Sequence, residues 1–486
     1  MTAIQTIEAM LQAAVGGINA VIWNYLLVGV LPLVGLYFSA RLGLIQLRRF
    51  PQMLRVVFAG GHEGSAGISP FEALCTSLAS RIGTGNLVGV AIALGAGGAG
   101  AIFWMWVVAF FGMATAYAES SLAQLYKVRD GAGQYRGGPA FYMARGLRAH
   151  WMGVLFSIFL LVAFGLVFSA VQANSISAAM AEAFAIDRRW SAIGLAVLAG
   201  TIIFGGLRSI ARFAVLVVPL MAAVYLALAL WVVFSNAAQV PAMLSLIVHS
   251  AFGLEPAAGG ILGGLAAAML NGVKRGLFSN EAGMGSAPNI AAAAMPVPHH
   301  PASQGLVQSF GVFVDTLLVC TATALMILLS GALGSGEQDG IRLTQAAMAQ
   351  HFGAWGPTFI AVSLFFFALT SIVGNYAYAE SAVIFLRGGR KGLLLMKAGA
   401  IAMVGWGAVT RVGLVWDTAD AAMGLMALIN LVAIMMLSGL VVKLTRDYDA
   451  QLRAGKVPRL DASAYPELGD RIDRTIWTER PTVPPA

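Results

Sequence analysis

Charged residues are scarce in this chain. Only 11% of its 486 residues are Asp, Glu, Lys or Arg, whereas 59% are hydrophobic, and the mean hydropathy is +0.80. Soluble domains carry roughly 25% charged residues, so this chain has too little charge to cover a globular surface in water. The composition excludes a multidomain cytosolic enzyme, a disordered regulator and a nucleic-acid-binding module. It indicates a membrane protein.

Cysteine and histidine are also rare. Cys75 and Cys320 fall in apolar segments far apart in the sequence, and we expect two free thiols rather than a disulfide. The six histidines show no metal-ligand spacing, and the sequence contains no H-E-x-x-H motif. These absences argue against a membrane-embedded enzyme and against a resident cofactor.

Long hydrophobic runs dominate what remains. A helix needs about 20 mostly apolar residues to cross the hydrocarbon layer. The first run, near 15–40, is too long for the apolar part of a signal peptide and is expected to remain as an anchor. The sequence predicts eleven spans, near 18–42, 68–94, 99–125, 148–183, 190–206, 211–235, 258–294, 304–332, 356–386, 393–412 and 421–445.

Basic residues concentrate in alternate loops between these spans. Lys and Arg are retained on the cytoplasmic side of membrane proteins, so the net charge of +8 indicates orientation rather than a nucleic-acid partner. The basic set predicts an outer N-terminus and a cytoplasmic C-terminus, which an odd number of spans requires. Its members are Arg41, Arg48, Arg49, Arg55, Lys127, Arg129, Arg136, Arg145, Arg148, Arg208, Arg212, Arg387, Arg390, Lys391 and Lys397.

Two predicted spans contain residues that a simple anchor would avoid. Glycines, hydroxyls and an Asn gather at 83–86, and a similar group with a Glu gathers at 280–285. A glycine costs about 1 kcal/mol in a helix interior, and a charge at mid-membrane costs about 2.5–3.5 kcal/mol or more. Close helix packing could explain the glycines but not Asn86, Asn280 and Glu281. We therefore predict that both helices are interrupted and line an enclosed cavity.

The two interruptions occupy matching positions, each in the first helix of a group of five. Such a pair indicates an inverted-repeat transporter. The predicted fold is an all-α polytopic membrane protein with a five-plus-five inverted repeat preceded by one extra helix. Its parts are 1–67 (extra helix and basic loop), 68–257 (repeat one), 258–445 (repeat two) and 446–486 (polar cytoplasmic tail).

An interrupted helix offers unpaired N–H groups, which suit a carboxylate, and unpaired carbonyls, which suit a cation. Two opposed interruptions therefore predict a site for a small zwitterion and a cation. We expect the carboxylate at Gly83, Thr84, Gly85 and Asn86. The amino group and side chain are expected against Phe278, Ser279, Asn280 and Glu281.

Three long strings carry a family resemblance. The segments RIGTGNLVGVA at 81–91, IFWMW at 102–106 and RGLFSNEAGMGSAP at 275–288 resemble signatures of the alanine/glycine–cation symporter family. The resemblance covers nearly the whole chain. It implies a leucine-transporter-type fold with one extra span, coupling to Na⁺ (or H⁺ in some members), and alanine or glycine as substrate.

The resemblance also implies a cation site between two helices. Its ligands would be the carbonyls of Ala79, Ile82 and Phe367 with the hydroxyls of Thr370 and Ser371; Ser371 would also border the substrate. Without the resemblance, these two hydroxyls would be read as ordinary interhelical hydrogen-bond partners.

One position departs from the family pattern. The family usually has Trp after the segment TSIVG, whereas this chain has Asn375. If that ring normally fills the pocket beside the substrate side chain, Asn375 leaves more room and adds polarity. We therefore hypothesise a substrate larger or more polar than glycine.

Two further carboxylates, Glu119 and Asp315, lie within predicted spans. One interpretation is a structural ion pair with Arg81, Lys274 or Arg275, and the other is a proton or cation relay.

The sequence thus predicts a monomeric secondary active symporter of a prokaryotic plasma (inner) membrane. It would couple inward Na⁺ movement to uptake of a small neutral amino acid such as alanine or glycine. Coupling to H⁺, a larger amino acid and, less favoured, an ion channel remain the alternatives.

Overall fold

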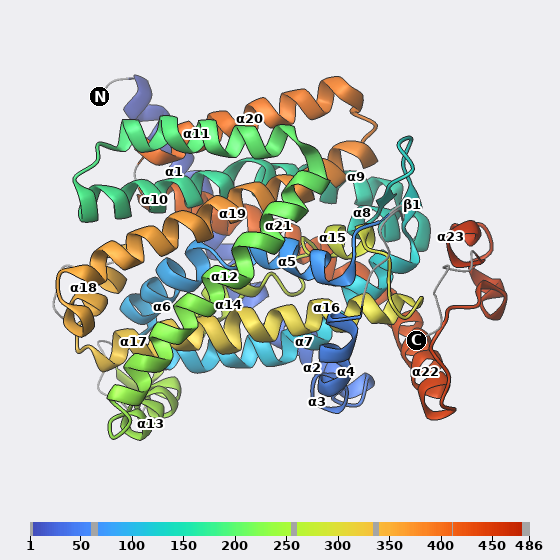
Figure 1. Ribbon diagram of the computed structural model, residues 1–486, viewed down its shortest axis with the longest axis horizontal. Coiled ribbons are helices and arrows are strands. Elements are labelled where there is room, and N and C mark those ends of the chain that lie inside the picture. Colours follow the sequence, from blue (N-terminus) through green and yellow to red (C-terminus); the bar gives the residue numbers. More distant parts are fainter. Residues whose placement is uncertain (1–2, 60–66, 254–259, 334–339, 411, 479–486) are drawn as a thin grey trace.

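The computed structural model describes residues 3–59, 67–253, 260–333, 340–410 and 412–478, and these are mostly helical. Most helices run along the long axis of the molecule (Figure 1). The described part also contains a two-stranded antiparallel hairpin, β1 (Val128–Arg129) and β2 (Tyr135–Arg136). The longer helices are α1 (Ala3–Val21), α2 (Val28–Arg41), α5 (Pro70–Arg81), α7 (Gly100–Leu125), α9 (His150–Leu160), α10 (Phe168–Phe184), α11 (Arg188–Phe204), α12 (Gly206–Ser235), α14 (Gly260–Asn280), α16 (Pro301–Val312), α19 (Trp355–Phe385), α20 (Gly389–Val409) and α21 (Val412–Met436).

The described residues contain eight helices long and apolar enough to cross a membrane, or nine if a bent pair counts as one span. This establishes a multi-pass membrane protein, but not the predicted total of eleven. Two predicted spans account for the difference. The span near 190–206 is α11, with only 17 residues, and the span near 258–294 is divided between α14 and the short helix α15 (Pro288–Ala293).

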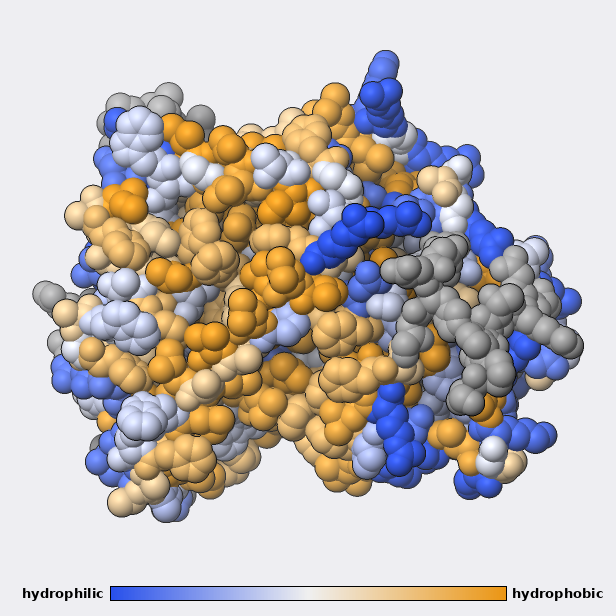
Figure 2. Space-filling view, in the orientation of Figure 1, coloured by the Kyte–Doolittle hydropathy of each residue, from blue (hydrophilic) through white to orange (hydrophobic). Residues whose placement is uncertain are grey.

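Hydrophobic side chains form a broad band between the two ends of the molecule on the face shown in Figure 2. One end, called here the α22 end, carries α3 (Ile45–Arg48), α4 (Phe50–Val57), the hairpin and the C-terminal helices α22 (Ser438–Arg453) and α23 (Arg474–Thr478). The opposite α18 end carries α13 (Val240–Ala251) and α18 (Ile341–Phe352). The band is what lipid would cover.

Helix α7 packs against both α14 and α16. Small residues permit the close approach. A Cβ on Gly272 of α14 would lie 2.4 Å from the carbonyl oxygen of Ala101, and one on Gly305 of α16 would lie 2.3 Å from Ser121 Oγ. Since lipid provides no hydrophobic drive between helices, such contacts between small residues hold membrane bundles together.

The predicted bounds of the last span, 421–445, are wrong. The apolar segment runs over 413–436 within α21. Residues 438–445 belong to α22, a separate helix with one buried face and charged residues on the other. Its buried Val441, Val442 and Leu444 continue the hydrophobic run in the sequence, which is why the run extends past the end of the span.

The C-terminal segment folds back onto the α22 end. Arg48 and Arg49 both form ion pairs with Asp449 of α22, at 2.5 and 2.6 Å. The indole Nε1 of Trp477 donates to the carbonyl of Leu125 at 3.4 Å. His299 Nε2 lies 3.0 Å from the carbonyl oxygen of Ile476. The tail therefore joins loops that are far apart in the sequence.

The docked tail should loosen in acid. Burial, and next the nearby charge of Lys127, lower the pKa of His299 from 6.5 to about 4. The docked state thus binds fewer protons than the free state between these values, so docking weakens as pH falls from about 6.5 to about 4. Hydrogen–deuterium exchange of residues 460–478, corrected for intrinsic rates, should rise at least about tenfold from pH 7.5 to pH 4.5. The His299→Gln variant should lose most of this pH dependence; an unchanged dependence would contradict the assignment.

Candidate substrate and cation site

The first interruption begins where α5 ends at Arg81. The helix starts with a capping box in which Ser69 and Glu72 satisfy each other's backbone N–H groups. Its last intrahelical bond runs from the Ile82 N–H to Leu78, at 2.7 Å, and Ile82 then turns to an extended conformation. The chain resumes as a π-helical turn, η2 (Gly85–Gly89), followed by α6 (Val90–Gly97). The two parts are bent by 50°.

Side chains satisfy the backbone at this interruption. The Gly83 N–H donates to Asn86 Oδ1 at 3.0 Å, and the Thr84 N–H donates to Gln172 Oε1 at 3.1 Å. Two N–H groups of the predicted carboxylate cradle therefore already have acceptors. A substrate carboxylate would have to displace these two acceptors or share the N–H groups with them. The Thr84 hydroxyl has no protein partner.

The second interruption follows Asn280, the last residue of α14. Glu281, Gly283 and Gly285 all have positive φ, of 58°, 87° and 83°. The left-handed region costs a non-glycine residue about 1 kcal/mol or more, so Glu281 is held there by its surroundings. Its Oε1 accepts from Ser80 at 2.8 Å and its Oε2 from Ser286 at 2.5 Å.

The two interruptions are in direct contact. A Cβ on Gly85 would lie 3.1 Å from the Cα of Ser279 and 3.2 Å from the ring of Phe278. Asn86 Nδ2 donates to Asp315 Oδ1 at 2.8 Å, and Ser279 Oγ donates to Asp315 Oδ2 at 2.5 Å. Asp315, on the π-helical segment η5 (Phe313–Cys320), thereby connects the two interruptions.

Most of the predicted cation ligands converge. Ser371 Oγ lies 3.4 Å from the carbonyl oxygen of Ile82 and 3.0 Å from that of Phe367. Thr370 Oγ1 donates to the same Phe367 carbonyl at 2.7 Å. Ala79 lies one turn earlier on α5. Its carbonyl loses the usual intrahelical donor, because the Gly83 N–H is directed to Asn86 instead.

Asn375 of α19 is fully buried against α5. Its Oδ1 lies 2.6 Å from Ser80 Oγ, the same hydroxyl that contacts Glu281. Its Nδ2 has no protein partner, and the same is true of Asn280 Nδ2. Buried donors without acceptors are rare in folded proteins, so these amides mark where a ligand oxygen could bind.

The ion-pair interpretation of Glu119 and Asp315 is wrong. Within the described part of the chain neither carboxylate pairs with Arg81, Lys274 or Arg275. Lys274 and Arg275 instead both pair with Asp420 of α21, Lys274 at 2.6 Å. Glu119 accepts from the Gly283 N–H at 3.2 Å and from Asn430 Nδ2 at 2.8 Å, so it supports the second interruption.

Several site residues escaped the sequence reasoning. Ser80, Gln172 and Asn430 carry no motif of their own, whereas Ser286 lies within the string at 275–288 but received no role there. The available signal is a polar group inside an apolar span: residues 172–177 read QANSIS within a stretch otherwise apolar enough to cross the membrane.

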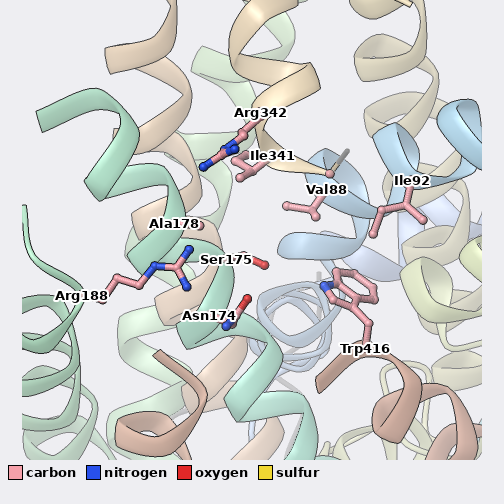
Figure 3. Close-up of a pocket in the computed structure, with 10 residues that line it drawn as sticks. Val88, Ile92, Asn174, Ser175, Ala178, Arg188, Ile341, Arg342 and Trp416 are labelled. Atoms are coloured by element: carbon pink, nitrogen blue, oxygen red, sulfur yellow. The ribbon is translucent and has the colours of Figure 1, made fainter. Parts of the chain in front are cut away.

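Aromatic rings cover the interruptions on one side. The rings of Phe168 and Phe278 are stacked with centroids 4.7 Å apart, and Phe278 lies 4.7 Å from Trp416 of α21. The Arg275 guanidinium lies over Trp416, 4.9 Å from the ring centroid. Beyond Trp416 lies a cavity of about 240 Å³ (Figure 3).

Comparisons with known proteins agree over nearly the full length. The profile of the Sodium:alanine symporter family matches residues 8–462. The chain is 46% identical to the probable sodium/glutamine symporter GlnT of Bacillus subtilis (strain 168), covering 93% of each chain. It is 48% identical to the amino-acid carrier protein AlsT of the same organism, over 92% of this chain and 94% of AlsT.

Among solved structures, MhsT in complex with L-phenylalanine matches with a TM-score of 0.53 and 14% identity, covering 78% of this chain and 90% of MhsT. At this identity the match shows the fold alone, which is of the leucine-transporter type.

Proposed function

The chain belongs to the sodium:alanine symporter family and is a transporter rather than an enzyme, and from this premise we propose that it couples inward Na⁺ movement to uptake of a small neutral amino acid. Alanine, glycine or a somewhat larger polar analogue is the proposed substrate, carried by alternating access. The membrane potential alone supplies about 2.3 kcal/mol per charge per 100 mV, enough for roughly fifty-fold accumulation.

The observation that carries this proposal is a set of buried polar atoms without protein partners at the two interruptions and on the helix beside them. They are Thr84 Oγ1, just before η2, Asn280 Nδ2 at the end of α14, and Asn375 Nδ2 of α19. A zwitterion bound among Gly83, Thr84, Asn280 and Glu281 would satisfy them. The Glu281 carboxylate would attract the ammonium group. The Thr84 hydroxyl would donate to the substrate carboxylate, which would share the Gly83 and Thr84 N–H groups with Asn86 and Gln172.

We place the cation at the carbonyls of Ala79, Ile82 and Phe367 and the hydroxyls of Thr370 and Ser371. This is an all-oxygen set, which suits a hard cation such as Na⁺. Ser371 also provides the coupling. A Cβ on Gly83 would lie 2.2 Å from Ser371 Oγ, so the cation ligands contact the substrate cradle directly. Binding of either solute then orders the same residues and raises the affinity for the other.

The arrangement in the membrane follows from the same proposal. The basic α22 end would face the cytoplasm and the α18 end the outside of a prokaryotic plasma membrane. Residues 68–257 and 258–445 would form the two inverted repeats, and a monomer would suffice for transport.

Selectivity should depend on Asn375. Because this side chain is buried beside Ser80 and its Nδ2 has no protein partner, Asn375→Trp should fill the proposed pocket beside the substrate side chain and remove the donor. Uptake of glycine relative to serine or glutamine should then rise about tenfold, the effect expected for one or two methylene-sized changes. Competition of labelled alanine uptake by unlabelled amino acids measures this. Asn375→Ala is the matched control, because it removes the amide without adding volume. Identical profiles for wild type and Asn375→Trp would remove the hypothesis.

The function is tested by reconstitution. Purified protein in liposomes should accumulate labelled alanine above equilibrium with an inward Na⁺ gradient. It should only equilibrate slowly when choline replaces Na⁺ at constant pH. A proton gradient without Na⁺ forms the third condition: accumulation there would assign the coupling to H⁺. Saturation with alanine distinguishes a symporter from a channel.

A further inference from the structure

The cavity beyond Trp416 lies towards the α18 end (Figure 3). Its lining comes from η2, α6, α10, α11, α18 and α21, with Gly340 just before α18. We call it the arginine cavity. Its polar lining consists of Asn174 and Ser175 of α10, Arg188 of α11, Arg342 of α18 and Trp416 of α21. Val88 of η2 adds an apolar wall, so one side of the cavity belongs to the interrupted helix itself.

Two aromatic rings separate the arginine cavity from the interruptions. Trp416 lines the cavity and contacts Phe278, whose ring would lie 3.2 Å from a Cβ on Gly85. Trp416 and Phe278 therefore lie between a solute in the arginine cavity and the proposed substrate site.

The cavity carries hydrogen-bond donors without protein acceptors. Trp416 is only 5% exposed, and its buried indole Nε1 has no hydrogen-bond partner in the protein. Figure 3 shows this nitrogen turned towards Asn174. A buried indole N–H ordinarily has a hydrogen-bond acceptor, and the protein provides none for Trp416 Nε1. The missing acceptor would come from a ligand.

The charges around the cavity favour an anionic group. Among the described residues Arg188 forms no ion pair, and Arg342 has only a long, exposed contact with Glu182, at 3.6 Å. Asn174 uses its Nδ2 to bind the carbonyls of Gly407 and Thr410, at 2.7 and 2.8 Å. Its amide oxygen is thus the atom left for a ligand, and it is an acceptor suited to an ammonium group.

We propose that the arginine cavity is a receiving site for the zwitterionic amino acid, occupied before the substrate passes Trp416 and Phe278. The carboxylate would bind Arg188, Arg342 and the Trp416 N–H, while the ammonium group would bind the Asn174 oxygen and the Ser175 hydroxyl. This inference rests on the proposed function, since it concerns the route of the same substrate.

The test is Na⁺-driven alanine uptake by the full chain in liposomes. The double variant Arg188→Gln/Arg342→Gln should raise the KM for alanine about tenfold and leave the maximal rate within about twofold, because it removes carboxylate contacts of the receiving site and leaves the proposed transport site unchanged. Choline chloride added at constant Na⁺ should raise the wild-type KM and leave that of the double variant unchanged. Trp416→Phe, which keeps an aromatic ring at this position and removes the N–H, should also raise the KM but retain the salt dependence.

Arg189→Gln is the matched control, because it removes a positive charge from the same first turn of α11 at an exposed position that does not line the cavity. Its KM should equal that of wild type. If the wild type transports alanine and all variants have the same KM as wild type, the receiving site alone is overturned. The same conclusion follows if the double variant has a lower maximal rate at an unchanged KM. A wild type that neither binds nor transports alanine would overturn the proposed function, and the receiving site with it.

Discussion

Replacing Gly83 with alanine should reduce amino-acid uptake by about a hundredfold or more. The new methyl group would lie 2.2 Å from Ser371 Oγ and 2.8 Å from Gln172 Oε1. Both contacts are far inside van der Waals distance, so the side chains must move. Ser371 belongs to the proposed cation ligands, and Gln172 holds the Thr84 N–H in place. One methyl group would thus disturb the cation and substrate positions together.

Gly95→Ala is the control for this substitution. Gly95 lies in α6, the second part of the same interrupted helix, and a Cβ there would meet no atom within 4 Å. Its uptake should stay within about twofold of wild type, since an exposed helical glycine gains rather than loses stability on replacement by alanine. Thermal melting of both variants separates misfolding from loss of transport. Full uptake by Gly83→Ala would show that Ser371 and Gln172 are not required where the structure places them.

Asp315→Asn should abolish uptake, to below about one hundredth of the wild-type rate. The carboxylate accepts from Asn86 of η2, from Ser279 of α14 and from its neighbour Thr316, the last at 2.7 Å, so it connects both interruptions. An amide at this position loses the charge. It also has one acceptor oxygen instead of two, so an NH₂ group would face either the Asn86 amide or the two hydroxyls. A buried hydrogen-bond network is less stable when one of its polar groups lacks a partner than when all are paired.

The pH dependence of uptake distinguishes the two roles that remain for Asp315. If it relays a proton, the wild-type rate should change with pH between 5.5 and 8.5 at constant Na⁺, and any residual rate of Asp315→Asn should not. If it only fixes the interruptions, the wild-type rate should be flat and the variant should melt at a lower temperature.

Asp461→Asn is the matched control. This residue is exposed and caps a short helix, where asparagine serves equally well. It should transport normally. Uptake by Asp315→Asn within twofold of wild type would contradict both roles.

The class of protein could be predicted from the sequence because composition is a local property. A run of about 20 apolar residues has few solutions other than a membrane span, whatever the rest of the chain does. The glycines and polar residues at 83–86 and 280–285 were conspicuous for the same reason, since they violate local helix preference. Span bounds were less certain, because Val441, Val442 and Leu444 look alike in a spanning helix and on the buried face of α22.

The partners of the buried charges could not be predicted. Arg275 pairs with Asp420, which is 145 residues away, and Asn86 binds Asp315, which is 229 residues away. Nothing in the local sequence of Asp315 or Glu119 excludes Lys274 or Arg275 as a partner. The choice depends on which helices are neighbours and on which faces meet.

The sequence by itself determined that this chain resides in lipid, that two of its helices are interrupted, and which family it resembles. All three follow from local hydropathy, local helix energetics and the identity of short strings. Only the tertiary structure decided that Asp315 connects the interruptions, that Asp420 pairs with Lys274 and Arg275, and that Arg188 and Arg342 line one cavity with the Trp416 indole. Those contacts join helices distant in the chain, and a hydrogen bond at 3 Å depends on their packing rather than on their order.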